Sequence, residues 1–148
     1  MRIFELERTQ FLPASREEVF AFFRVPQNLQ EITAPWLHLR VARKGVAELG
    51  EGARIEYSVR IRGIPLRWES RISAWDPPRG FVDEQLRGPY RSWVHRHGFE
   101  PVEGGTRVHD RVRYALLGGV IVDRLFVRGD LERIFDYRLG RLAERFGS

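Results

Sequence analysis

Two histidines spaced two residues apart are the side chains of this sequence best suited to chemistry. His95 and His97 lie in a segment where polar and apolar residues alternate, as they do in a half-buried β-strand. Side chains of a strand repeat every two residues, so Trp93 and Phe99 share the face of the two imidazoles. Because that face carries the aromatic rings, we expect it to point inward. An inward imidazole can orient a ligand, transfer a proton or bind a metal ion.

Carboxylates occur in the segments before and after the histidines. By the same parity Asp110 points inward. Asp83 and Gln85 lie in a segment that starts at Phe81 and has apolar residues on both faces, so its alternation does not show which face points inward. Burying an unpaired carboxylate costs several kcal/mol. We therefore expect these carboxylates to pair with the histidines or with Arg138.

Four interpretations of such a cluster stay open. The cluster could be a structural network that fixes strand register, since buried polar groups are normally satisfied by their neighbours. It could anchor the polar end of a ligand in an apolar cavity. It could perform general acid–base catalysis, with His95, Asp83 and Asp110 as the acid–base groups. A metal site through His95 and His97 is the fourth, but its sequence signal is weak and we expect no metal.

The elements that position these residues follow from hydrophobic periodicity. Ser15 and Glu18 form a capping box, which predicts a helix that ends at Pro26. A second short helix is expected over residues 27–33. Alternating segments, separated by Gly and Pro turns, predict strands over 2–12, 37–41, 55–61, 66–72, 81–87, 93–99 and 108–114.

The C-terminal segment has the 3.6-residue periodicity of a long helix, expected over about residues 121–146. Gly129 and Gly140 each weaken that helix by about 1 kcal/mol relative to alanine. Asp130 is expected as an N-cap where the helix kinks or restarts. The apolar stripe consists of Ile121, Leu125, Leu131, Ile134, Phe135, Leu139, Leu142 and Phe146.

Composition excludes several classes of protein. The 148 residues contain no cysteine, so a disulfide framework and a thiolate metal site are excluded. With 43% hydrophobic residues and no long apolar run, we expect one globular domain over 1–148, no transmembrane segment and no signal peptide, and hence a cytoplasmic protein. The net charge of +5 comes from 24 Arg and the single Lys44, interleaved with acidic residues, so we expect no specific nucleic-acid binding.

The order strand, two helices, six strands and long helix predicts an α+β fold in which one helix covers an antiparallel sheet. The chain resembles the START/polyketide-cyclase superfamily (SRPBCC), and within it the bacterial ligand-binding branch. The resemblance implies a helix-grip fold, with a seven-stranded antiparallel sheet curled around the long C-terminal helix, an apolar cavity between them, and Asp83 and Gln85 pointing inward. The matching stretches are 13–20, 81–85, 88–90, 93–99, 105–110, Tyr114 and 134–138.

Together the residues and the resemblance predict a protein that binds a small hydrophobic or amphipathic molecule, such as a lipid, isoprenoid or polyketide, without a cofactor. The first alternative is a cyclase or dehydratase that uses the cavity His and Asp residues, and the second alternative is a regulatory or interaction module with a filled core. The sequence leaves open whether the protein forms a homodimer. The expected ligand-binding residues are Tyr57, Trp68, Asp83, Gln85, Trp93, His95, His97, Asp110, Tyr114, Phe135 and Arg138. The resemblance also implies that Trp36, with Ile32, Pro35 and Leu37, lies at the cavity entrance.

Overall fold

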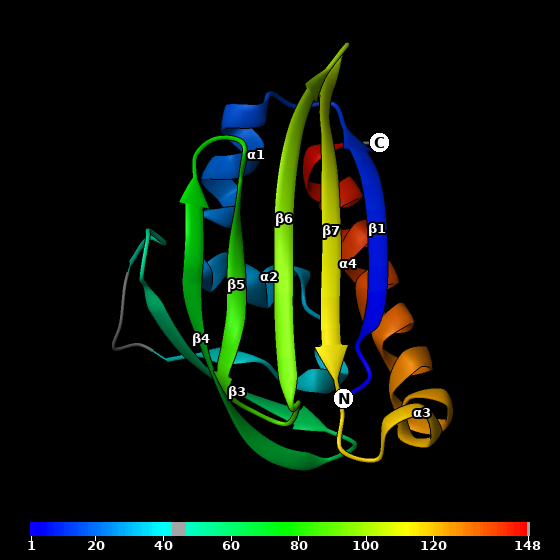
Figure 1. Cartoon of the computed structure of the whole chain (residues 1–148). Coiled ribbons are helices and arrows are strands. Elements are labelled where there is room, and N and C mark those ends of the chain that lie inside the picture. Colours follow the sequence, from blue (N-terminus) through cyan, green and yellow to red (C-terminus); the bar gives the residue numbers. More distant parts are fainter. Residues whose placement is uncertain (43–46, 148) are drawn as a thin grey trace.

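The computed structural model describes residues 1–42 and 47–147, and Lys44 lies outside these ranges. Figure 1 shows strands on one side and helices behind them. The elements are β1 (Phe4–Leu12), α1 (Arg16–Phe23), the 3-10 turn η1 (Pro26–Asn28), α2 (Leu29–Ile32), the 3-10 turn η2 (Pro35–Leu37), β2 (Arg40–Val41), β3 (Arg54–Ile61), β4 (Ile64–Asp76), β5 (Gly80–Arg87), β6 (Ser92–Val102), β7 (Gly105–Ala115), α3 (Gly119–Val122), the π-helical turn η3 (Asp123–Val127) and α4 (Arg128–Phe146).

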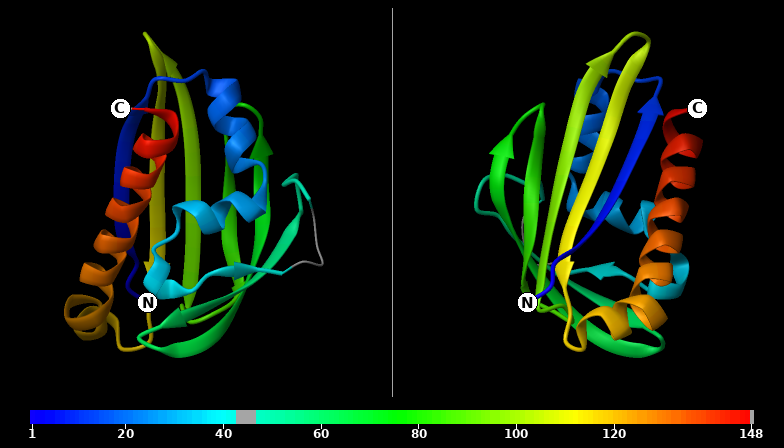
Figure 2. Two further views of the ribbon diagram at one scale, coloured as in Figure 1. Left: turned by 180° about the vertical axis from the view of Figure 1, so that it is seen from behind. Right: turned by 45° about the vertical axis from the view of Figure 1, so that its right-hand side comes forward.

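Within the described residues, seven strands form one antiparallel sheet in the order β1-β7-β6-β5-β4-β3-β2. The sheet is strongly curled, and α4 runs along its concave side, as Figure 2 shows. From β3 to β7, strands that follow one another along the chain pair through short turns, while β2 pairs with β3 at one edge of the sheet and β1 pairs with β7 at the other. The α+β class and the helix-grip arrangement are confirmed.

The alternation of β6 has the predicted phase. Trp93, His95, His97 and Phe99 are buried, while Arg96 between them is exposed. Asp83 pairs with His95 across the β5–β6 ladder, which places the Asp83 face of β5 on the inner side.

Helix α1 begins as its sequence predicts. The Ser15 Oγ accepts a hydrogen bond from the Glu18 backbone N–H at 3.1 Å. The helix buries Val19, Phe20, Phe22 and Phe23 against the sheet and ends before Pro26, where the chain turns into η1.

The second strand is shorter than the sequence predicts. The expected strand over 37–41 is wrong in its first half, because Pro35–Leu37 forms a 3-10 turn and His38 has a left-handed backbone with φ 48°. Within the described residues of this segment, the part that pairs with β3 is Arg40–Val41. This turn brings Trp36 toward α4, where its ring centroid lies 5.9 Å from that of Tyr137.

The C-terminal helical segment differs from the prediction near its start. The irregularity is the π-helical turn Asp123–Val127, upstream of the Gly129–Asp130 pair, and Val127 rather than Asp130 occupies the N-cap position of α4. Asp130 instead pairs with Arg62 at 3.2 Å. Ile121, ahead of the π turn, and Leu125, within it, are 69% and 64% exposed and do not belong to the buried stripe.

The buried side chains form two apolar clusters. One lies around α1 and includes Phe20, Phe23 and Phe99. The other lies under the first half of α4 and includes Trp93 and Phe135. His97 contacts Phe23 and Phe81 of the first cluster, and the neighbouring His95 contacts Phe135 of the second, so the histidines lie at the junction.

On the outer face, arginines pair with acidic residues of neighbouring strands. The Arg111 Nε lies 3.2 Å from Glu5 and 3.3 Å from Glu7, and the Arg107 Nη1 lies 3.0 Å from Glu100. Among helices of the described ranges, none combines the length and the hydropathy needed to cross a membrane.

Candidate functional site

A cavity of about 600 Å³ lies between the sheet and α4. Its walls are mostly aromatic and aliphatic, and its polar groups are concentrated in Asp83, His95, His97 and Arg138 at the inner end and in Arg62, Asp130 and Arg133 elsewhere. Because of this cavity, the helix and the sheet do not fill the space between them. In the described residues the core is therefore not filled, as it would be in the interaction module considered above.

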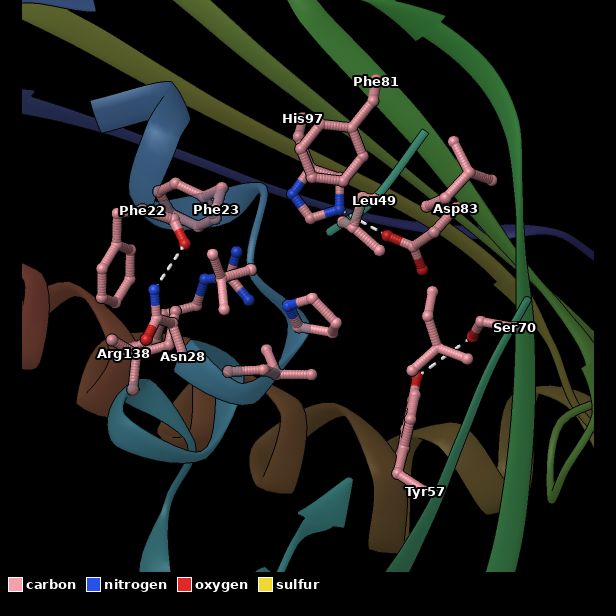
Figure 3. Close-up of a pocket in the computed structure, with 16 residues that line it drawn as sticks. Phe22, Phe23, Asn28, Leu49, Tyr57, Ser70, Phe81, Asp83, His97 and Arg138 are labelled. Carbon is pink, nitrogen blue, oxygen red and sulfur yellow. Dashed lines mark hydrogen bonds and ion pairs between the residues drawn. The ribbon is translucent and has the colours of Figure 1, made fainter. Parts of the chain in front are cut away.

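A second cavity of about 70 Å³ adjoins the first, closer to α1 (Figure 3). Its walls include Phe22, Leu49, Ile55, Ile72 and Phe81. The residues that line both cavities are Leu29, Tyr57, Asp83, His97 and Arg138. The polar groups therefore lie at the boundary between a large and a small apolar space.

Each buried histidine bonds to one aspartate. The His97 Nε2 lies 2.5 Å from the Asp83 Oδ2, and the His95 Nε2 lies 2.7 Å from the Asp110 Oδ1. The two imidazole rings stack with centroids 3.7 Å apart. The expected pairing of the carboxylates with the histidines is confirmed, and it satisfies one nitrogen of each ring.

Arg138 reaches the same cluster from α4. It is 8% exposed, and its guanidinium lies over the rings of Phe23 and Phe135, at 5.3 and 5.8 Å from their centroids. Its Nη2 is 3.6 Å from the Asp110 Oδ1, beyond hydrogen-bond distance. Within the described part of the chain, the Nε and Nη2 have no hydrogen-bond partner.

The charges of the cluster follow from burial and pairing. Burial opposes ionisation of Asp83 and Asp110, but the hydrogen bonds from the histidines and the charge of Arg138 outweigh it and hold the pKa of both carboxyls below the usual value. For His97, burial dominates and the neighbouring His95 adds to it, which lowers the pKa to about 4 despite the bond to Asp83. At neutral pH the cluster thus holds two carboxylates, one guanidinium and a neutral His97.

Because Asp83 is ionised and His97 is neutral, the His97 Nε2–H donates to the carboxylate and the Nδ1 keeps a lone pair. That Nδ1 is buried and accepts no hydrogen bond from the described residues. The second oxygen of Asp83 likewise takes no bond from them, and 16% of this side chain is exposed. Figure 3 shows the carboxylate projecting from β5 into the space between His97 and Tyr57.

Tyr57 forms the opposite wall of this space. Its hydroxyl lies 3.1 Å from the Ser70 Oγ, which also accepts a hydrogen bond from the Trp68 Nε1 at 3.0 Å. Burial, with the nearby charge of Asp83, raises the pKa of Tyr57 far above its usual value. The phenol therefore stays neutral and is held in place by a polar contact.

Most of the predicted site residues are brought together by the fold. Those that line the larger cavity are Tyr57, Trp68, Asp83, Trp93, His95, His97, Phe135 and Arg138. Three others do not line either cavity. Gln85 bonds to the backbone of Tyr90, Asp110 lies behind His95, and the fully buried Tyr114 donates to the Asp123 Oδ1 at 2.6 Å.

Sequence reasoning missed several wall residues. Phe22, Phe23 and Leu29 line the cavities from the N-terminal helices, although none of them is among the expected ligand-binding residues. Of the residues expected at the entrance, Trp36 and Leu37 line the larger cavity and Ile32 the smaller, whereas Pro35 is exposed and lines neither.

The donor atoms of Asp83, His95 and His97 lie within 4.8 Å of one another, as a metal site would require. However, the two rings stack with centroids 3.7 Å apart and planes inclined by only 24°, so their in-plane lone pairs lie in two nearly parallel, offset planes. A bound ion would also have to replace the hydrogen bond between His97 and Asp83. This arrangement suits hydrogen bonding better than metal coordination.

Comparison with known proteins agrees with this architecture. Residues 4–147 match the family described as polyketide cyclase / dehydrase and lipid transport. The chain belongs to this family, within the START/polyketide-cyclase superfamily. No curated protein matches the sequence.

Solved structures share the family's fold at low sequence identity. They include Ara h 8.0201 (14% identity, 98% of both chains covered, TM-score 0.72) and protein CV1439 from Chromobacterium violaceum (12% identity, 97% of both, 0.76). TTHA0849 from Thermus thermophilus is a third (23% identity, 96% of both, 0.67). At these identities the likeness concerns the fold alone.

Proposed function

We propose that the protein binds a small amphipathic molecule in the cavity between the sheet and α4, with the polar part of the ligand at the Asp83–His97–Arg138 cluster. The observation that carries the proposal is a cavity of about 600 Å³ that is lined mainly by apolar side chains and has convergent polar groups at its inner end. Such a combination is typical of small-molecule sites.

Apolar contact would supply most of the affinity. Burial of apolar surface contributes about 25 cal/mol per Å². Trp68, Trp93 and Phe135 offer flat rings along the wall, and Trp93 packs edge-on against Trp68 with centroids 5.2 Å apart. Such rings offer apolar surface to a lipid-like chain or to a fused-ring polyketide, and the polar groups would orient the bound ligand.

The polar cluster supports orientation of a ligand more than proton transfer. A general base works best when its pKa is near the working pH. His97, with a pKa of about 4, is a weak base at neutral pH, and its free Nδ1 is buried. A cyclase or dehydratase that uses His95 remains the second candidate, favoured by the hydrogen bond between its Nε2 and Asp110.

Native mass spectrometry of gently purified protein tests the proposal. We expect a co-purified molecule that is released on denaturation and that is recovered unchanged after incubation with fresh protein. Recovery of a dehydrated or cyclised product would instead establish the enzyme. If no small molecule co-purifies and neutral apolar probes do not change the fluorescence of Trp68 and Trp93, the binding function is overturned.

A further inference from the structure

The two cavities and the polar boundary between them constrain the shape of the ligand, if the proposed binding function holds. The small cavity of about 70 Å³ has room for roughly two or three groups of the size of a water molecule or a methylene, at about 30 Å³ each. Its other walls are mainly apolar and include Ile55, Ile72 and Phe81. A ligand whose polar group sits at the boundary can therefore extend apolar parts in both directions.

The charges of the boundary constrain the polar group. The ionised Asp83 carboxylate lines both cavities at this boundary, where it would repel an anionic group placed beside it. Asp83 presents an oxygen that accepts no bond from the described residues, and Arg138 presents nitrogens that donate none. A hydroxyl meets both needs, because it donates one hydrogen bond and accepts others.

We propose that the ligand is an uncharged alcohol whose hydroxyl lies within the molecule, between a short alkyl end in the small cavity and a larger apolar body in the large one. The hydroxyl donates to Asp83 and accepts from Arg138. A terminal hydroxyl at the same place would leave the small cavity without an apolar occupant.

Positional isomers of one alcohol test the proposal, because they share composition and differ only in where the hydroxyl stands. We would measure Kd for dodecan-1-ol, dodecan-4-ol and dodecan-6-ol by displacement of the neutral fluorophore N-phenyl-1-naphthylamine. We expect dodecan-4-ol to bind most tightly, by about tenfold or more over the others, the range that one or two methylene groups give in an apolar pocket.

Two isoleucines of β3 provide a matched pair of variants. Ile55 and Ile61 are both half-buried and share a face of the strand, but Ile55 lines the small cavity and Ile61 the large one. Ile55→Phe should abolish the preference for dodecan-4-ol and leave the affinity for dodecan-1-ol within about twofold. Ile61→Phe should weaken both alcohols and keep their ratio. Leu49→Phe, at another wall of the small cavity, replaces Ile55→Phe if that variant does not fold.

Dodecan-4-one tests the hydroxyl separately, because a ketone cannot donate to Asp83. We expect it to bind about tenfold more weakly than dodecan-4-ol. Equal binding of ketone and alcohol overturns the hydroxyl assignment. Equal or tighter binding of dodecan-1-ol overturns the internal position and leaves the proposed binding function intact. If none of these compounds displaces the fluorophore, both proposals fail.

Discussion

At the scale of single residues, the charge state of His97 is set by its position between Phe81 and the second histidine. Its ring stacks on Phe81 at 4.2 Å and on His95 at 3.7 Å, so water cannot solvate an imidazolium there. The hydrogen bond to Asp83 raises the pKa of His97, but it does not overcome the effect of burial, which lowers it. His97 is thus neutral in the folded protein over a pH range in which the unfolded chain is protonated.

This difference predicts an acid-sensitive stability. The unfolded chain binds a proton at His97 as the pH falls below about 6.5, whereas the folded protein binds it only near pH 4, so the free energy of unfolding decreases as the pH falls between these values. We expect a loss of about 1–3 kcal/mol between pH 7 and pH 4.5, measured by urea unfolding. His97→Gln should flatten this part of the profile, while the exposed His38→Gln should not. A profile that is already flat in the wild type would contradict the prediction.

The two aspartates of the cluster separate a structural role from a ligand-binding role. Both bond to a buried histidine, but only Asp83 lines the cavities. Asp83→Asn and Asp110→Asn should each destabilise the protein by about 1–3 kcal/mol. Only Asp83→Asn should reduce the preference for dodecan-4-ol over dodecan-4-one, because an amide can donate to the ketone. Equal preference in both variants and the wild type would return the cluster to a purely structural role.

At the scale of elements, period-two alternation was sufficient to predict the inner face of β6, because a strand has only two faces and Trp93 and Phe99 mark one of them. In β4, the alternation does not predict which residues face inward near the end of the strand. Its register with β5 shifts between Ile72 and Ala74, so that Trp75 rather than Ala74 packs against Phe20, at 5.2 Å. An extra residue in a strand leaves no mark in the alternation that precedes it.

In the candidate site, too, the sequence pattern predicts which residues are neighbours but not which of them form hydrogen bonds. Strand order predicts that Asp83 and Asp110 flank the two histidines. The register places Asp83 opposite His95, and His97 opposite Asp110, yet the hydrogen bonds run diagonally, from His97 to Asp83 and from His95 to Asp110. Side chains lean along their strands, and the direction depends on packing with α1 and α4 that a sequence pattern does not encode.

Two glycines test how these elements are held together. Gly140 lies within α4, and an added Cβ there would meet nothing within 4 Å, so Gly140→Ala should stabilise the protein by about 0.5–1 kcal/mol. At Gly80 in β5, a Cβ would overlap the His97 carbonyl oxygen. Gly80→Ala should therefore push β5 from β6 and destabilise by about 1–3 kcal/mol. Thermal unfolding of both variants measures the two signs, and a neutral Gly80→Ala would contradict the close approach.

At the scale of the whole molecule, the net charge of +5 is distributed over a surface in which positive and negative groups alternate. Arg111 on β7 lies between Glu5 and Glu7 of the neighbouring strand β1, and Arg113 also faces Glu5. Arg8 pairs with Asp136 of α4 at 3.2 Å. Each such pair contributes little to stability, but it reduces the positive potential that a nucleic-acid phosphate would meet.

We therefore predict only weak, salt-sensitive binding to nucleic acid. A protein that neutralises few phosphates releases few counterions, so its affinity is low and is lost at modest salt. On a double-stranded DNA column the wild type should elute below ~0.3 M NaCl, a concentration at which non-specific contacts are lost. The double variant Glu5→Gln/Glu7→Gln releases Arg111 and Arg113 from their partners and should elute at higher salt than the wild type. Retention of the wild type above ~0.3 M, with no shift in the variant, would mean that a basic surface other than this strand pair binds nucleic acid.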